Sequence, residues 1–334
     1  MNLERVNQIA KAVLYEGYML YPYRPSSVKN RQRWNFGVLY PQAYNEVHGG
    51  EETCSMRTEC LVSGSAGTIL EVKLRFLHLQ LRSMSPSSEV RKSSLPDGWQ
   101  EVVEREVSFP ELALGKLTDE SVRHVFVFPY EKQIVSEANA RGETIGMVER
   151  LQQTIEGVIE VSAKRVGKDL LKLSVHVQNV TPMEAPAADR DAVLMQSLVS
   201  THTILGVRGG EFVSLLEPPV ELQELVAGCQ NVGAWPVLVG DEGQRDTILA
   251  SPIILYDYPQ IAPESAGDLF DGTEIDEILS LRIMTLTDEE KREIRESDDR
   301  ARQILERTDA MPAEQFMKLH GAMRSVRPLG RDTP

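Results

Sequence analysis

Apolar and polar residues alternate along much of the middle of this chain, and such alternation predicts β-strands. The clearest case is residues 155–164 and 171–178, two alternating runs separated by the turn-forming Gly167–Asp169. Because successive side chains of a strand point to opposite faces, one face of this hairpin should cover a core while the other faces water.

A change of phase interrupts the alternation between Thr58 and Arg82. From Leu70 to Phe76 the alternating apolar residues occupy the even positions, whereas from Leu77 to Leu81 they occupy the odd positions. Two explanations fit this pattern. A bulge at Phe76 and Leu77 re-aims the strand, or the strand is central in its sheet and is covered differently at its two ends.

Further strands are predicted for six segments rich in Val, Ile, Leu and Phe. They are Val102–Phe109, Val122–Phe128, Ser200–Val207, Phe212–Leu216, Trp235–Val239 and Ile248–Tyr256. Pro110 and Pro129 should bound the first two, since proline cannot donate a hydrogen bond within a sheet. The serine-rich stretch Ser83–Asp97 is predicted to be a loop, and Gly209–Gly210 and Gly240–Gly243 are predicted to be turns.

Helical spacing of apolar residues appears near both ends of the chain. Residues 2–20 carry apolar positions every three or four residues, and Pro22 excludes a continuation of that helix. A shorter helix is predicted for Ala187–Leu198. These helices should flank or interrupt the strands of the body.

The region after Pro263 is acidic and is predicted to be helical. From Glu264 to Asp309 there are fifteen Asp or Glu residues against seven Lys or Arg. Within it, Thr287 and Glu290 have the spacing of a capping box, which opens a helix. A last helix should begin at Met311 and Pro312, because proline is acceptable in the first helical turn, and should include Phe316, Leu319 and Met323.

Together these patterns predict an α+β protein with a β-rich body, built as an antiparallel sheet or a sandwich. We expect three parts: residues 1–54 with the N-terminal helix, the body at 55–262, and an acidic helical region at 263–334. The body is also open to a division into two subdomains near 182–190, where prolines and alanines mark a loop.

Charge and hydropathy narrow the class of protein. The 334 residues carry a formal net charge of −14, which opposes binding to nucleic acid or to an anionic membrane. No apolar run is long enough for a membrane span, and charges at Glu4, Arg5 and Lys11 interrupt any signal peptide. A soluble protein of the cytoplasm, without membrane insertion, is therefore expected.

Cysteine, histidine and motif patterns point to no catalytic or metal chemistry. Cys54, Cys60 and Cys229 are too few and too widely spaced for a zinc knuckle, and we expect reduced thiols that pack as small apolar groups. The six histidines show no spacing that brings two ligands together locally, and those in strands are expected at the surface or hydrogen-bonded. No nucleophile elbow, phosphate-binding loop or dinucleotide fingerprint is present. We therefore assign no catalytic residue, metal or cofactor.

The segment from Gly17 to Asn45 is the best candidate for a binding surface. It has no acidic residue, and its basic side chains are interleaved with aromatic ones. Tyr, Trp and Arg are the side chains most enriched at protein-binding hot spots, so we expect a protein partner. The predicted contact residues are Tyr21, Tyr23, Arg24, Lys29, Arg31, Arg33 and Trp34.

Three other uses of this segment remain open. Arg24, Lys29 and Arg31 could surround a small anionic ligand, in an enzyme or a binding protein. The tyrosines could instead cover the core while the basic groups pair with the acidic helices. Head-to-tail association of two copies would use the same charge difference between molecules.

Two stretches resemble a known family: YEGYMLYPYRPSSVKNRQRWNFGVLYP at Tyr15–Pro41, and LFDGTEIDEILSLRIMTLTDEEKRE at Leu269–Glu293. They are similar to an uncharacterised protein family encoded beside nickel–iron hydrogenases of the high-affinity, actinobacterial type. The resemblance implies an accessory role in hydrogenase assembly, maturation or attachment in a bacterial cytoplasm, with hydrogenase subunits as partners. It carries over no catalytic residue, and the lack of C-x-x-C pairs argues against handling of nickel or iron–sulfur clusters. With no catalytic motif found, we predict a non-enzymatic role.

Overall fold

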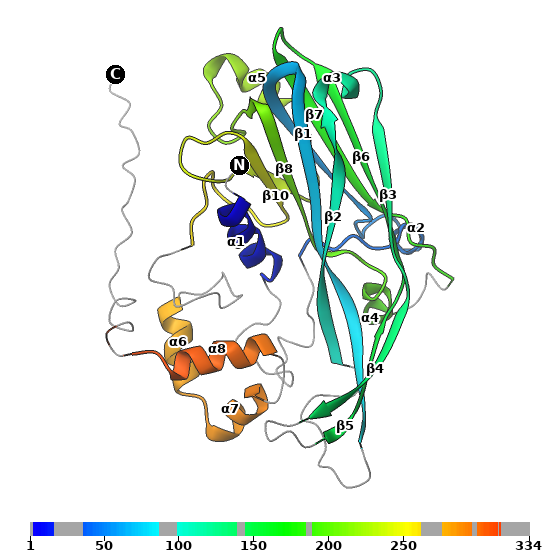
Figure 1. The fold of residues 1–334 in the computed structure, drawn as a ribbon, viewed down its shortest axis with the longest axis vertical. Coiled ribbons are helices and arrows are strands. Elements are labelled where there is room, and N and C mark those ends of the chain that lie inside the picture. The colour runs from blue at the N-terminus through cyan, green and yellow to red at the C-terminus, as the bar shows by residue number, and fades with distance from the viewer. Residues whose placement is uncertain are drawn as a thin grey trace.

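The structure is a computed structural model that describes residues 3–16, 36–86, 99–138, 144–184, 189–261, 276–295, 299–312 and 314 (Figure 1). Its helices precede, interrupt and follow the strands. The helices are α1 (Leu3–Leu14), α2 (Gln42–Val47), α3 (Leu114–Leu117), α4 (Arg190–Leu194), the 3₁₀ helix η2 (Val220–Leu222), α5 (Gln223–Ala227), α6 (Asp276–Met284), α7 (Asp288–Arg295) and α8 (Asp299–Asp309).

Ten strands form one antiparallel sheet, which confirms the predicted α+β class with a β-rich body. They are β1 (Ser55–Pro86), β2 (Trp99–Ala113), β3 (Val122–Phe128), β4 (Glu131–Ala138), β5 (Thr144–Gln152), β6 (Ile155–Arg165), β7 (Leu170–Asn179), β8 (Val199–Phe212), β9 (Trp235–Leu238) and β10 (Thr247–Ser251). The main order is β3-β6-β7-β1-β8-β10-β9, while β2 and β5 also pair with β1, and β4 pairs with β5. Strands from both sides of residues 182–190 are therefore hydrogen-bonded into the same sheet.

The sheet folds over on itself at the upper end of β1. Figure 1 shows β1 arching there and running back down the molecule, and the β1–β8 ladder shifts register between Gly64 and Ile69 at this place. Gly209 of β8 takes a φ of 80° opposite the arch, and its carbonyl accepts a hydrogen bond from Thr68 Oγ1 at 2.8 Å. The predicted turn at Gly209–Gly210 is thus a bend within one strand.

Side chains on the two facing layers enclose the main hydrophobic core, here called the interlayer core. Phe76 of β1 and Phe126 of β3 are not on neighbouring strands, yet their ring centroids lie 6.1 Å apart. The core also includes Val62, Leu74, Leu173 and Leu205.

The phase change at Phe76 and Leu77 reflects two different cores on the two faces of β1. Phe76 lies in the interlayer core, whereas Leu77 and Leu79 lie in a second core formed with α4, α6, α7 and α8. Against β2 the register runs unbroken through both residues, while against β8 it shifts between Arg75 and Leu77. The phase change therefore arises mainly because different cores cover the two ends of the strand. The bulge-like shift in register at this point occurs only in the pairing of β1 with β8.

The hairpin at residues 155–179 is confirmed. β6 and β7 pair in register from Gly157 with Asn179 to Arg165 with Leu171, and the amides of Val166 and Gly167 bond to the Leu170 carbonyl in the turn. The predicted turn at Gly240–Gly243 also connects two paired strands, β9 and β10.

Several predicted strand ends are wrong. β2 continues through Pro110. The β1–β2 register shifts opposite this proline, between Leu70 and Val72, so the N–H that proline lacks is not needed for a hydrogen bond between the strands. β1 extends through Ser83 to Pro86 because β5 supplies a partner. β8 ends at Phe212 and β10 at Ser251, so 213–216 and 252–256 are not strand.

Helix α1 confirms the predicted N-terminal helix and packs on the outer face of β8, β9 and β10. Val6, Ile9, Ala10 and Val13 make a third core there with strand residues that include Ile204. α4 is shorter than predicted, with Asp189 Oδ1 accepting from the Ala192 amide at its start. The predicted last helix, from Met311 through Phe316, Leu319 and Met323, lies almost entirely outside the described residues.

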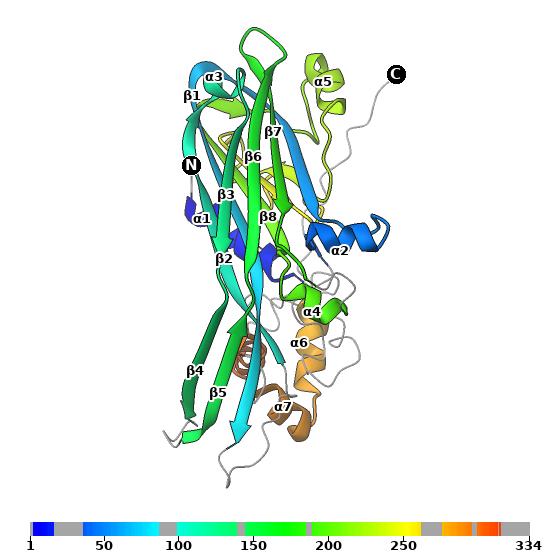
Figure 2. The ribbon, with the colours of Figure 1, turned by 90° about the vertical axis from the view of Figure 1, so that its right-hand side faces the viewer.

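Helix α8 and Tyr15, the residue that follows α1, meet at one carboxylate of β2. The Glu104 carboxylate accepts a hydrogen bond from Tyr15 Oη at 2.7 Å and pairs with Arg300 of α8 at 3.2 Å. The Arg300 guanidinium also lies 3.6 Å from the centroid of the Tyr15 ring. This contact joins three segments that are distant in sequence. Figure 2 shows the neighbouring helices α6 and α7 at the height of the lower half of β1.

The capping box at α7 is confirmed and gives a first prediction. The Thr287 amide donates to Glu290 Oε2 at 2.8 Å, and the Glu290 amide donates to Thr287 Oγ1 at 3.3 Å. Thr287→Ala removes one half of this exchange and should cost about 1 kcal/mol of unfolding free energy. Urea unfolding measures the loss. Thr287→Ser, which keeps the hydroxyl, should be nearly neutral, and equal losses for both variants would contradict the assignment.

Candidate functional site

All seven predicted contact residues lie outside the described residues. They are Tyr21, Tyr23, Arg24, Lys29, Arg31, Arg33 and Trp34. The described residues that flank this stretch, Glu16 and Phe36, both line one groove on the surface. The groove is therefore the described surface that adjoins the predicted contact residues along the chain.

The groove lies between α1 and the segment Ile253–Ile261, with a volume of about 430 Å³. One wall consists of Ile9, Ala12 and Val13, which recur at helical spacing on one face of α1, and of Glu16 in the turn that follows the helix. The opposite wall and the end are formed by Phe36, Ile253, Ile254, Leu255, Pro259, Gln260 and Ile261. Among the described residues that line the groove, Glu16 alone has an ionisable side chain.

Large apolar side chains stay exposed around this groove. Ile254 is 71% exposed, and its neighbour Tyr256 is 86% exposed. Phe36 and Ile261 are also exposed. Exposed apolar side chains that gather around a groove mark a surface for another protein, whereas single ones carry no meaning.

Backbone contacts fix the base of the groove at Phe36. The Phe36 carbonyl accepts from the Ser200 amide at 3.2 Å, and the Gly37 carbonyl accepts from the Thr201 amide at 2.9 Å. Gly37 has a φ of 54°, and a Cβ added there would lie 2.6 Å from Pro252 Cγ. Glycine is thus required where the chain enters the groove next to Pro252.

Two histidines are fully buried in strands. His78 bonds through Nε2 to the Gln153 carbonyl at 2.9 Å, and His202 through Nδ1 to the Ser200 carbonyl at 2.6 Å. Burial lowers the pKa of each to about 4, with Arg105 adding to the effect at His78. Both imidazoles are therefore neutral and buried, whereas the sequence left a surface position open for them.

Ser200, beside His202, has a strained backbone. Its φ is 52°, a left-handed value that is rare for a residue with a side chain. The Ser200 carbonyl accepts a hydrogen bond from His202, and the Ser200 amide donates one to the Phe36 carbonyl. The strained conformation therefore lets β8 contact Phe36, which lines the groove.

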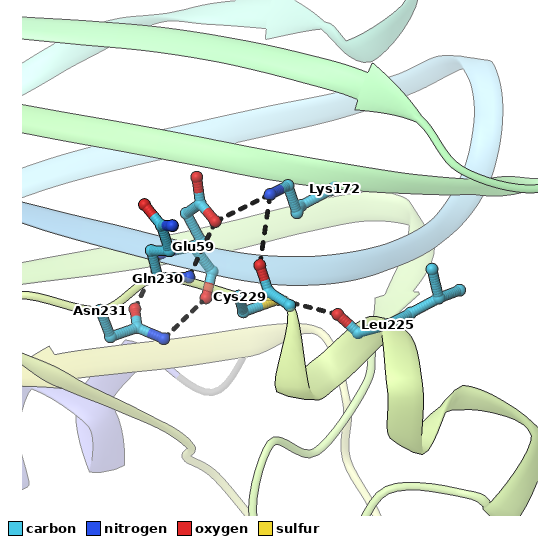
Figure 3. Close-up of polar contacts among 7 residues, drawn as sticks. Glu59, Lys172, Leu225, Cys229, Gln230 and Asn231 are labelled. Atoms are coloured by element: carbon cyan, nitrogen blue, oxygen red, sulfur yellow. Dashed lines mark hydrogen bonds and ion pairs between the residues drawn. The ribbon is translucent and has the colours of Figure 1, made fainter.

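A polar cluster on β1 holds the loop that follows α5 (Figure 3). The Glu59 carboxylate accepts from Lys172 Nζ at 2.9 Å and from the Gln230 amide at 2.8 Å. The side-chain amide of Asn231 exchanges two hydrogen bonds with the Glu59 backbone, at 2.8 and 3.1 Å.

The cysteines near this cluster are free thiols. Burial raises the pKa of the Cys60 thiol far above its usual range and also raises that of Cys229, although the Lys172 charge opposes the shift at Cys229. Both thiols therefore stay protonated near neutral pH, which makes them poor nucleophiles.

Across the residues that the structure describes, no three or more His, Cys, Asp or Glu side chains are grouped so as to hold a metal ion. None of the described helices is both long and apolar enough to cross a membrane.

The sequence did not predict the groove. The segment 253–256 falls within the predicted strand Ile248–Tyr256, and the apolar spacing of residues 2–20 predicts a helix but no neighbour for it. Pro252 and Pro259, which bracket the short apolar run, are the signal that this segment leaves the sheet. Comparison with protein-family models and with curated proteins yields no match to this chain.

Proposed function

We propose that this protein is a non-enzymatic accessory protein that binds an acidic protein partner. The observation that supports this best is the groove between α1 and Ile253–Ile261, because Glu16 and Phe36, which flank the basic and aromatic stretch in sequence, both line it. An apolar side chain of the partner would enter the groove, and its carboxylates would pair with Arg24, Arg31 and Arg33.

The chemistry of the groove favours a protein over a small anion. Its described lining is almost entirely apolar, and the one ionisable side chain in that part of the lining, Glu16, is acidic and would repel an anionic ligand. The resemblance of Tyr15–Pro41 suggests the first partner to test, the subunits of a nickel–iron hydrogenase, and with it a role in their assembly.

Charged residues introduced beside the groove should block partner binding. Ile254→Asp and Tyr256→Asp change side chains that are largely exposed, so the fold should be retained while an apolar contact with the partner is lost. Co-purification with co-expressed hydrogenase subunits should fall about tenfold or more. Ile134→Asp makes the same kind of change at an exposed residue of β4, away from the groove, and should have no effect.

The basic residues need a separate test. Replacing Arg24, Arg31 and Arg33 together by Glu should also abolish co-purification, since carboxylate pairing would become repulsion. Unchanged co-purification of this triple variant rejects the role of the basic segment. Unchanged co-purification of the two groove variants rejects the groove.

A further inference from the structure

Between Ser55 and Leu61, one edge of β1 pairs with β7. The opposite edge, here called the outer edge, is closed by a loop and not by a strand. β8 takes over the outer edge only from Val62. In between, Arg57 exchanges two backbone hydrogen bonds of 2.9 Å with Val232, and the Val213 amide bonds to the Leu61 carbonyl.

At Glu59 a side chain takes the place of a backbone. The Asn231 amide group accepts from the Glu59 N–H and donates to the Glu59 carbonyl, the same pair of bonds that a neighbouring strand would make (Figure 3). A carboxamide and a peptide group have equivalent donors and acceptors. The edge is therefore fully competent for pairing with another strand.

The loop that closes this edge, residues 215–233, is weakly attached. None of its residues is buried, although it contains η2 and α5. Polar contacts hold most of it, namely the bonds of Gln230 and Asn231 to Glu59 and the two backbone bonds of Val232 to Arg57, while Leu215 at its start packs against the interlayer core. Segments that bury little apolar surface open at low free-energy cost, so this cover should open locally while the cores stay intact.

The edge is self-complementary in charge. Arg57 and Glu59 point to the same face of β1, and a second copy can pair antiparallel about a two-fold axis at Thr58. Arg57 then lies opposite Glu59 of the other copy, twice in the dimer. If one strand slides along the other by two residues, the smallest shift that keeps the two-fold symmetry and the hydrogen bonds, Arg57 comes to lie opposite Arg57, or Glu59 opposite Glu59. Both of these alternative registers place like charges together.

The available length of edge agrees with this register. Opening residues 215–233 frees the edge from Ser55 to Cys60, because Val213, outside the cover, keeps its bond to the Leu61 carbonyl, and this stretch contains both Arg57 and Glu59. We propose that the β1 edge from Ser55 to Cys60 is a homodimerisation site, closed in the monomer by residues 215–233 and occupied by the same edge of a second copy when that cover opens.

Opening the cover should reveal the dimer. Asn231→Ala removes both amide bonds to Glu59, and the association constant measured by sedimentation should rise about tenfold or more over the wild-type protein. In that background, Arg57→Glu should return the protein to monomer. Arg165→Glu, the same charge change at an exposed residue of β6, should leave the dimer intact.

A mixing experiment tests the register. Arg57→Glu and Glu59→Lys, each in the Asn231→Ala background, should both be monomeric alone, because each places like charges opposite one another. Mixed, they should form a heterodimer in which both cross-strand pairs are attractive. Circular dichroism checks that each variant is folded. A monomeric Asn231→Ala protein, a dimer that survives Arg57→Glu, or a mixture no heavier than its folded components overturns the proposal.

Discussion

Acidification from pH 7 to pH 4 should remove several kcal/mol of stability, because His78 and His202 are buried as neutral groups. Their folded-state pKa values are about 4, while the unfolded chain has ordinary histidines with a pKa near 6.5. Between these values the unfolded state binds protons that the folded state does not. The stability from each group is therefore fully present above about pH 6.5 and is lost as the pH falls toward 4, by roughly 3 kcal/mol per histidine.

The surroundings of both histidines oppose protonation. The cation near His78 is Arg105, and the one near His202 is Arg75, so a second positive charge would meet repulsion as well as burial. The bond from His202 to the Ser200 carbonyl works in the opposite direction but does not outweigh burial.

Two substitutions separate this effect from the titration of carboxylates. His78→Gln keeps a donor near the Nε2 position for the Gln153 carbonyl, and His202→Asn keeps one near Nδ1 for the Ser200 carbonyl. Urea unfolding at pH 7, 6 and 5 should show a smaller fall in stability for each variant than for the wild-type protein, and the two reductions should add. A wild-type slope in both variants would show that these histidines are not protonated on unfolding.

Local sequence patterns predicted the elements whose partners are close in the chain. The β6–β7 hairpin follows from alternation on both sides of Gly167–Asp169, and the start of α7 follows from Thr287 and Glu290. In both cases the groups that bond are separated by few residues, so the pattern contains nearly all of the information.

The fold-over of the sheet could not be predicted in this way. It depends on Thr68 reaching the Gly209 carbonyl, and on the close approach of Gly210 to Ser63, where an added Cβ would lie 2.6 Å from the Ser63 carbonyl oxygen. These contacts join residues more than 140 positions apart. The glycines were visible in the sequence, but the strand opposite them was not.

The candidate site shows the same division. Composition located a basic and aromatic stretch, and the spacing in α1 predicted a helix before it. The groove needs Ile253–Ile261 to lie beside α1, and no periodicity relates segments that are so distant in sequence.

The largest single-residue effect should come from Phe76, where the two cores adjoin across β1. Its side chain is fully buried, with ring centroids 6.1 Å from Phe126 and 5.6 Å from Phe128. Phe126 in turn fills the space over Gly157, where an added Cβ would lie 2.1 Å from its ring. Phe76 therefore packs against two rings, one of which is itself closely packed against the backbone of β6.

Phe76→Ala should cost about 3–5 kcal/mol of unfolding free energy, because the removed ring leaves a cavity in the interlayer core. Phe76→Leu keeps most of the volume and should cost about 1.5 kcal/mol or less. Phe36→Ala makes the same chemical change at a ring that is 42% exposed, and should cost well under half as much as Phe76→Ala.

Urea unfolding of the three variants measures these differences at pH 7, where both buried histidines are neutral in the folded state. If Phe76→Ala costs no more than Phe36→Ala, the two layers do not meet at this ring. If Phe76→Ala loses much stability and Phe76→Leu loses little, the interlayer core is closed at this position of β1 by apolar volume. Aromatic chemistry would then not be required, because leucine retains the volume without the ring.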